Sequence, residues 1–347
     1  MPIVKFVFFE NKRKTMTETL VSLPSFARLS ERVWRILGLN PGKFTLQGTN
    51  TYLIGTGPRK LLLDCGEGRS EYISLLRTSL ATLGANTTIS DIIITHTHRD
   101  HWGGLEGILS TFPGPIRVHK YPWPANHLQS PVNVHTIPAQ FDVIPLRDGQ
   151  RIKPEGDDGT TLTVLYTPGH CEDHCCFLLE EENTLFTADC VLGQGTAVFN
   201  DLAEYVYGLK KLIDIVPGQL YPGHGPVIKD GVAKLTEYVR HREDREQEII
   251  RVLKSGEAGY AWSAMEIVRV VYKGYPERLF APAAAGVRLH LKKLMGEGKV
   301  VVRAGRISWQ EGGHLENTEA VEVQEELVKE EEGVERWIWK RDNEARI

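Results

Sequence analysis

Three histidines and one aspartate are crowded into six positions of the sequence, in the pattern H-x-H-x-D-H. These residues are His96, His98, Asp100 and His101. An apolar run that is typical of a strand precedes them, and Gly103 and Gly104 follow. On a tight loop, alternating side chains can point the same way, so this spacing suits two metal ions side by side. The glycines predict close backbone packing behind the loop.

Three further candidate ligands stand just after other strand-like runs. His170 closes TPGH, Asp189 closes FTAD and His224 closes YPGH. Open α/β layers usually place their sites at such strand ends. Imidazole nitrogens and carboxylate oxygens are donors that zinc, manganese and iron accept. One histidine alone would more often be a surface or core side chain, but seven donors in this arrangement predict a metal centre.

These motifs resemble those of the metallo-β-lactamase superfamily. HTHRDH, TPGH, the lone Asp189 and PGHG follow the family's order, and Asp64 in LLLDCG matches its first motif. GLNPGKFTLQGTNTYLIGTG, EENTLFTADCVLGQGTAVF and HLKKLMGEGKV are similar to one subgroup. That subgroup contains the animal β-lactamase-like protein 2, a single-strand-specific endoribonuclease, and the fungal polyketide thioesterases of this type. The resemblance spans about residues 27–305.

The resemblance implies a role for each ligand. One metal would be held by His96, His98 and His170, and the other by Asp100, His101 and His224, with Asp189 as the bridge. Asp64 would support this loop through hydrogen bonds without touching a metal. The ions would be two Zn²⁺, with Mn²⁺ as the alternative, about 3.5–4 Å apart. The nucleophile would be a metal-bridging hydroxide, and the catalytic residue Asp100 would orient it or accept its proton.

Cysteine-based catalysis is the competing chemistry. Cys171 and Cys175 flank His174, and a thiol beside a base can act as a nucleophile. We instead expect a strand after TPGH, with Cys175 and Cys176 buried on it and His174 at the rim of the site. The GTNT stretch at residues 48–51 lacks a P-loop lysine and is expected to be a turn between strands.

The elements that must position the site alternate in type. Short strand-like runs with turn signals, and helical spacing in EYISLLRTSLATLG and DLAEYVYGLKKLIDIV, predict a layered α+β domain. The resemblance implies an αββα metallo-β-lactamase sandwich, which we assign to residues 27–234. Three helices and a β-hairpin in KVVVRAGRISW predict a winged-helix-like module at 235–310. Residues 1–26 would be an extension, and the glutamate-rich 311–347 an acidic, disordered tail.

Charge and cysteine content suggest where the chain works. Residues 228–310 carry 16 Lys or Arg against 10 Asp or Glu, whereas 311–347 carry 5 against 12. Five cysteines without zinc-finger or disulfide-scaffold spacing predict free thiols in a reducing compartment. We expect the cytoplasm, with the mitochondrion as the alternative. No apolar run approaches the roughly 20 residues that cross a bilayer, so no membrane partner is expected.

The metal site by itself does not select a substrate. Resemblance to the fungal members favours a thioesterase that releases an acyl or polyketide chain from an acyl carrier protein in fungal secondary-metabolite biosynthesis. Its partner would be the carrier protein or a polyketide synthase product. Apolar material for such a substrate is available near Asp189 and in the long 122–145 segment, in Phe199, Tyr205, Tyr207, Trp123 and Phe141.

The alternative function is that of a single-strand-specific endoribonuclease. Basic side chains in the second module could bind the phosphates of single-stranded RNA. They are Arg288, Lys292, Lys293, Lys299, Arg303 and Arg306. The residues that bind substrate and the oligomeric state are not assigned by the sequence.

Overall fold

The computed structural model describes residues 19–124, 137–257, 260–303 and 335–339. The chain divides into two compact units, residues 1–239 and 240–347. The division falls within helix α5 (Gly231–Ser255). Within the described part of the chain, no helix is long and apolar enough to span a membrane.

Two β-sheets form the first unit. The larger sheet contains seven strands in chain order, β1 (Phe26–Arg28), β2 (Val33–Leu37), β3 (Asn50–Ile54), β4 (Arg59–Leu63), β5 (Thr88–Ile94), β6 (Arg117–Lys120) and β7 (Val143–Pro145). The smaller sheet has the order β12 (Gln219–Pro222), β11 (Thr184–Ala188), β10 (Cys175–Leu179), β9 (Leu162–Tyr166) and β8 (Arg151–Ile152). Cys175 and Cys176 therefore lie on a buried strand, as the sequence predicted.

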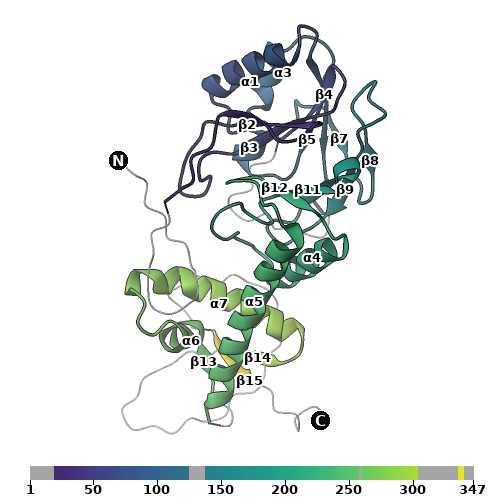
Figure 1. Cartoon of the computed structure of the whole chain (residues 1–347). Coiled ribbons are helices and arrows are strands. Elements are labelled where there is room, and N and C mark those ends of the chain that lie inside the picture. The colour runs from purple at the N-terminus through teal and green to yellow at the C-terminus, as the bar shows by residue number, and fades with distance from the viewer. Residues whose placement is uncertain (1–18, 125–136, 258–259, 304–334, 340–347) are drawn as a thin grey trace. The chain divides into compact units, whose positions relative to one another are not determined.

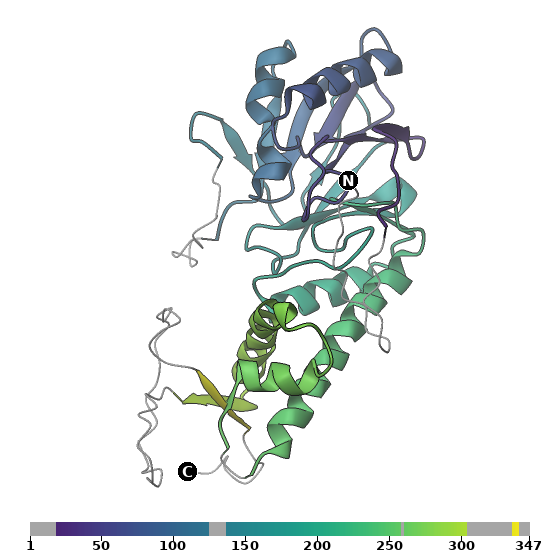
Figure 2. The ribbon, with the colours of Figure 1, turned by 90° about the vertical axis from the view of Figure 1, so that its left-hand side faces the viewer.

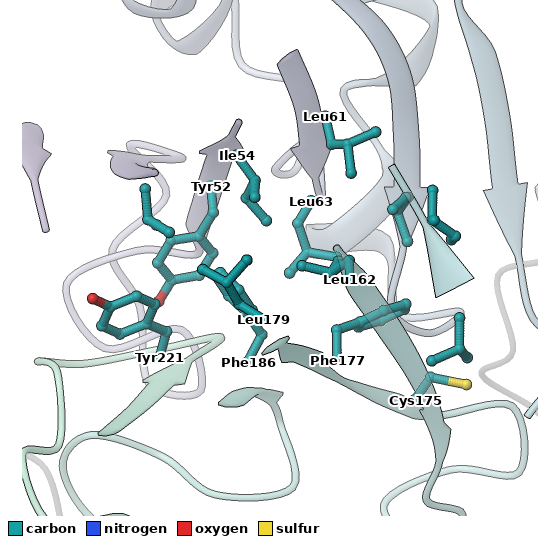
Figure 3. Close-up of a cluster of buried hydrophobic side chains, with 14 of the residues drawn as sticks. Tyr52, Ile54, Leu61, Leu63, Leu162, Cys175, Phe177, Leu179, Phe186 and Tyr221 are labelled. Atoms are coloured by element: carbon teal, nitrogen blue, oxygen red, sulfur yellow. The ribbon is translucent and has the colours of Figure 1, made fainter. Parts of the chain in front are cut away.

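The two sheets pack face to face through a shared apolar core. Successive side chains of a strand point to opposite faces, so Tyr52 and Ile54 on β3 face the smaller sheet while Leu53 faces away. The Tyr52 ring meets the edge of Phe186 with centroids 5.0 Å apart. Figure 3 shows side chains from both sheets meeting in this layer. Each fully buried Leu, Ile or Phe stabilises the fold by about 1.5–3 kcal/mol.

Helices cover the outer faces of the sandwich. Helix α1 (Ser70–Leu83) buries Tyr72, Leu76 and Leu80 in a second core with the outward side chains of the larger sheet. Helix α3 (Leu105–Thr111) joins it there, after the short α2 (Arg99–Trp102). Figure 1 shows α1 and α3 on one side and α4 (Leu202–Asp214) beyond the smaller sheet. The predicted αββα architecture is confirmed.

Strand directions bring three segments of the first unit to one edge. Strand β10 is antiparallel to both β9 and β11, and β12 is parallel to β11. Strands β9, β11 and β12 therefore all run the same way, and the chain leaves each of them at the same end of the smaller sheet. TPGH follows β9, Asp189 follows β11, and PGHG straddles the end of β12.

The described residues of the second unit form three α-helices, a short 3-10 helix (Glu277–Leu279) and a three-stranded sheet. Beside α5 this unit contains α6 (Ala264–Val271), α7 (Phe280–Gly296), β13 (Trp262–Ser263), β14 (Val300–Arg303) and β15 (Arg336–Trp339). A capping box starts α6, because the Ser263 hydroxyl accepts from the Glu266 backbone and the Glu266 carboxylate accepts from the Ser263 backbone. The predicted winged-helix module is therefore present.

The partner of β14 differs from the sequence prediction. We expected a hairpin within KVVVRAGRISW, but β14 pairs with β15, in the register Val302↔Trp337, and β15 also pairs with β13. Figure 2 shows the yellow strand β15 beside β14. Residues 336–339 thus form a strand, not part of a disordered tail, because burial of Trp337 (1% exposed) outweighs the surrounding charge. Residues 304–334 lie outside the described part.

Candidate metal centre

The structure brings all seven predicted ligands into two adjoining clusters. Within each cluster, one potential ligand atom from every residue lies within 4.8 Å of the others. The first cluster is His96, His98, His170 and Asp189, and the second cluster is Asp100, His101 and His224. His170, Asp189 and His224 come from the strand ends described above, whereas His96 and His98 follow β5 and Asp100 and His101 lie on the short helix α2.

Ring nitrogens converge in the first cluster. His98 Nδ1 lies 3.0 Å from both His96 Nε2 and His170 Nε2. His170 Nδ1 donates to the Val198 carbonyl at 2.7 Å, so its proton is used there and Nε2 carries a bare lone pair. Burial lowers the pKa of His96 well below 6.5, and burial and the nearby His170 lower the pKa of His98 to about 4. These two rings are therefore neutral at pH 7 and able to bind a cation.

The second cluster combines two rings with a carboxylate. Asp100 Oδ2 lies 3.3 Å from His101 Nε2 and 3.2 Å from His224 Nε2. Burial lowers the pKa of His224, but the carboxylates of Asp189 and Asp100 outweigh it and raise that pKa to about 9. The carboxylates of the second cluster therefore favour a positive charge beside His224. A divalent cation bound there would provide that charge.

Asp189 lies between the two clusters and offers one oxygen to each. Its Oδ2 lies 3.7 Å from His170 Nε2, in the first cluster. Its Oδ1 lies 3.4 Å from His101 Nε2 and 3.3 Å from His224 Nε2, in the second. A carboxylate in this position can ligate two ions at once.

Two buried polar atoms of the clusters also indicate that these residues can hold metal ions. His101 Nε2 and Asp189 Oδ1 are buried, and neither has a hydrogen-bond partner among the described residues. Buried polar atoms left without a partner are rare, since each costs about 1–3 kcal/mol. A ring nitrogen and a carboxylate oxygen thus face each other 3.4 Å apart, and a cation could bind both of them.

Asp64 orients His101 of the second cluster, and through Thr95 also His96 of the first cluster, by hydrogen bonds. Its Oδ2 accepts from His101 Nδ1 at 2.7 Å and from the Thr95 hydroxyl at 3.0 Å, and its Oδ1 accepts from the Thr95 backbone N–H at 2.9 Å. The Thr95 hydroxyl proton is therefore committed to Asp64, so the Thr95 oxygen accepts from His96 Nδ1 at 2.9 Å. One carboxylate thus fixes the ring orientation of a histidine in each cluster, the support that ligands usually receive.

Close backbone contacts behind the loop explain its glycines. A Cβ on Gly104 would lie 2.0 Å from the Cys65 carbonyl oxygen, and one on Gly103 would lie 2.5 Å from the Glu67 carbonyl oxygen. The predicted packing at these two positions is confirmed. Gly223, next to His224, is similar, because its Cβ would lie 2.5 Å from Asp189 Oδ1.

Two features near the site were not recognised in the sequence. His174 is fully buried, not at the rim as expected, and its Nε2 accepts from the Asp189 backbone N–H at 3.3 Å. Thr49, which we read as part of a turn, donates to Asp100 Oδ2 at 3.2 Å. Both contacts join residues far apart in the chain, so spacing alone gives no signal of them.

The cysteines flanking His174 are not arranged as nucleophiles. Cys171 and Cys175 are buried, and burial raises the pKa of both thiols well above 9.0. A protonated, buried thiol is a poor nucleophile. The structure thus favours the metal centre over cysteine chemistry.

The aromatic residues suggested for the substrate occupy varied places. Tyr205 is buried, its hydroxyl donating to the Cys190 carbonyl, and Phe199 stacks on its ring. Phe141 packs against the core under α1. Tyr207 is 63% exposed on α4, and Trp123 is partly buried. His127 and His135, in the same long segment as Trp123, lie outside the described residues.

Comparison with known proteins identifies the family. The model of the metallo-beta-lactamase superfamily matches residues 44–245, and that of the beta-lactamase associated winged helix domain matches residues 263–309. The chain therefore belongs to the metallo-β-lactamase superfamily of hydrolases, whose members bind divalent metal ions.

Relatives and solved structures agree with this membership. The beta-lactamase-like protein 2 homolog of Caenorhabditis elegans is 41% identical over 81% of this chain and 90% of its own length. The atrochrysone carboxyl ACP thioesterase of Aspergillus fumigatus is 35% identical over 79% and 85%. A beta-lactamase domain protein from Burkholderia ambifaria has a TM-score of 0.69 at 18% identity, over 92% and 95%, which shows the shared fold.

Proposed function

We propose that the two clusters hold two divalent metal ions and that the protein hydrolyses an acyl thioester, carried by an acyl carrier protein. The observation that carries the metal part is the position of Asp189, whose two oxygens face different clusters. Zn²⁺ and Mn²⁺ both accept this set of imidazole and carboxylate donors. His96, His98 and His170 would hold one ion and Asp100, His101 and His224 the other, with Asp189 between them.

When bound, such ions lower the pKa of a water molecule and polarise the oxygen of the substrate's carbonyl group. The chain's own residues decide where this happens. His96, His101, His170 and His224 are buried, whereas His98, Asp100 and Asp189 are partly exposed. A substrate must therefore approach on the side of these three residues. Asp100 lies on that side and can orient the attacking water or accept its proton.

Apolar side chains beside the site favour an acyl substrate. Phe44 is 71% exposed, on a segment whose Gly48 carbonyl accepts from His224 Nδ1 at 3.4 Å. Val198 is 60% exposed, and its carbonyl accepts from His170 Nδ1. Both side chains are exposed and therefore available to contact an apolar ligand. An acyl chain would find apolar contacts on the two segments that hold these histidines.

Single-stranded RNA is the second candidate substrate. It is favoured by the higher identity to the animal relative than to the thioesterase, since the subgroup that the sequence resembles includes an endoribonuclease. The basic residues support it less than the sequence suggested. Lys293 pairs with Glu246 and Glu297, and Lys299 pairs with Glu297. Arg288 and Lys292 are exposed, while Arg306 and the Arg303 side chain lie outside the described residues.

The test gives the metal-loaded protein each substrate separately, an acyl-carrier thioester and single-stranded RNA. We expect thioester turnover that Asp100→Ala abolishes. Phe44→Ala should raise KM for long acyl chains more than for acetyl, whereas Tyr207→Ala, which removes a different exposed aromatic ring, on α4, should change neither KM. RNA cleavage that Asp100→Ala abolishes, without thioester turnover, would replace the thioesterase by the nuclease.

A further inference from the structure

A buried chain of hydrogen bonds leads from the segment before β3 to the second cluster. The Asn40 side-chain amide nitrogen lies 3.0 Å from the Thr49 hydroxyl oxygen. That hydroxyl lies 3.2 Å from Asp100 Oδ2, the oxygen that also faces His101 and His224. Asn40 is 2% exposed and Thr49 fully buried, so water does not substitute for either partner.

The groups at the two ends of this series of hydrogen bonds determine which atom donates and which accepts in each bond. The Thr49 backbone N–H can only donate, and its partner at 2.9 Å is therefore the carbonyl oxygen of the Asn40 side chain. The amide NH₂ of Asn40 must then face the Thr49 hydroxyl and donate to it. The hydroxyl proton remains free to point only at the Asp100 carboxylate, which accepts.

The backbone around Asn40 is built to hold it in place. A Cβ on Gly38 would lie 2.9 Å from the Asn40 side-chain oxygen, and one on Gly48 would lie 3.2 Å from the same atom. Gly48 also has φ +128°, which disfavours any other residue. Two glycines thus leave room for one amide side chain, in one orientation.

The residue after Thr49 makes hydrogen bonds to the loop that carries His224, another member of the second cluster. The Asn50 side-chain amide donates to the carbonyls of Pro222 and Gly225, on either side of His224. Residues 48 to 50 therefore fix both Asp100 and the loop that carries His224. No member of the first cluster is bonded to Asn40 or Thr49 in the described residues.

We propose that Thr49, oriented by Asn40, is a positioning residue that aims Asp100 at the second cluster and sets the metal affinity of that cluster alone. This inference rests on the proposed two-metal site. Hydrogen bonds from neighbouring residues to a ligand typically change metal affinity 10–100-fold. Loss of the Thr49 hydroxyl weakens the binding of one ion and leaves the other as it was.

The test measures the two dissociation constants by titrating metal-free full-length protein with Zn²⁺ against a chromophoric chelator. For Thr49→Val we expect one of the two dissociation constants to rise about 10–100-fold and the other to stay unchanged. Thr49→Ser keeps the hydroxyl and should bind both ions as the wild type does. Asn40→Asp leaves Thr49 intact but puts a second acceptor beside its hydroxyl, so the proton is drawn from Asp100 and the same dissociation constant should rise as in Thr49→Val.

Thr51→Val is the matched control. Thr51 is also fully buried on β3, and its hydroxyl donates to the Ile36 carbonyl and accepts from Tyr72. This variant should lose stability in the metal-free state but keep both dissociation constants. Equal weakening of both ions in Thr49→Val, or unchanged affinities in Thr49→Val and Asn40→Asp, would overturn this inference alone. A wild type that binds fewer than two ions would instead refute the proposed function.

Discussion

In each candidate ligand histidine except His98, Nδ1 makes a hydrogen bond to the protein and Nε2 faces the other members of its cluster. His101 donates to Asp64, His170 to the Val198 carbonyl and His224 to the Gly48 carbonyl, while His96 donates to Thr95. Each partner fixes one tautomer and one ring orientation. The Nε2 atoms are therefore aimed at the two clusters by the protein before any ion arrives.

Asp189 is the residue on which the pairing of the two clusters depends most. We expect wild-type protein to hold two metal ions per chain and Asp189→Ala to hold one or none, because the variant removes a donor from both clusters at once. Elemental analysis after gel filtration measures this number. Asp158→Ala, which alters a fully exposed carboxylate, is the control. Unaltered metal content in Asp189→Ala would show that Asp189 is not a ligand.

His174 should matter through the backbone of Asp189. His174→Phe keeps an aromatic ring but removes the acceptor of the Asp189 N–H and the contact of His174 Nδ1 with Thr167, which should cost about 1–3 kcal/mol of unfolding free energy. It should also reduce metal retention, because Asp189 loses its anchor. Urea denaturation and elemental analysis measure the two effects.

His119→Phe serves as the comparison for this variant. His119 is a buried histidine bonded to Asp91, on β6. The His119→Phe variant should be less stable than the wild type but should bind the same amount of metal. If His174→Phe and His119→Phe retained metal equally, the anchor would be unnecessary.

At the scale of elements, the sequence predicted what short-range patterns encode. Strand-like runs ending in TPGH, FTAD and YPGH identified three of the ligand-bearing strand ends, and the α1 spacing identified a helix ending at Gly84. The role of Thr49 was missed because its partner Asp100 is 51 residues away and becomes a neighbour only through the sheet order. The burial of His174 was missed because its bond to the Asp189 backbone forms only when the neighbouring strands β10 and β11 pair.

The pairing of β14 with β15 could not be found from local pattern. The RWIW strand is embedded in glutamate-rich sequence, whose composition predicts disorder. The energy that orders it comes from tertiary contacts, since Trp337 is buried between β13 and β14. Composition averages over a segment and therefore conceals a four-residue strand.

Trp337→Ala tests that explanation. Removing a large, fully buried aromatic side chain should cost about 3–5 kcal/mol and unfold the second unit at a lower temperature. Trp339→Ala, on the same strand but only partly buried, should cost less. Calorimetry measures the transition, and tryptophan fluorescence follows it. An equal effect of the two substitutions would contradict the burial argument.

At the scale of the whole molecule, the two units differ in that only the first unit carries the candidate metal ligands. Both clusters and the hydrogen bonds that orient them lie within residues 1–239. The second unit contributes none of the seven ligands, and its Lys293 and Lys299 are paired with glutamates. The candidate metal centre therefore belongs to the sandwich alone.

The most direct test of the two-metal centre is the anomalous scattering of crystals grown with Zn²⁺ or Mn²⁺. We expect two adjacent peaks, one beside His98 Nδ1 and the Nε2 atoms of His96 and His170, the other beside Asp100, His101 and His224. The Asp189 carboxylate should lie between them, one oxygen toward each. A single peak in protein that is fully active, or peaks away from these seven residues, would contradict this expectation.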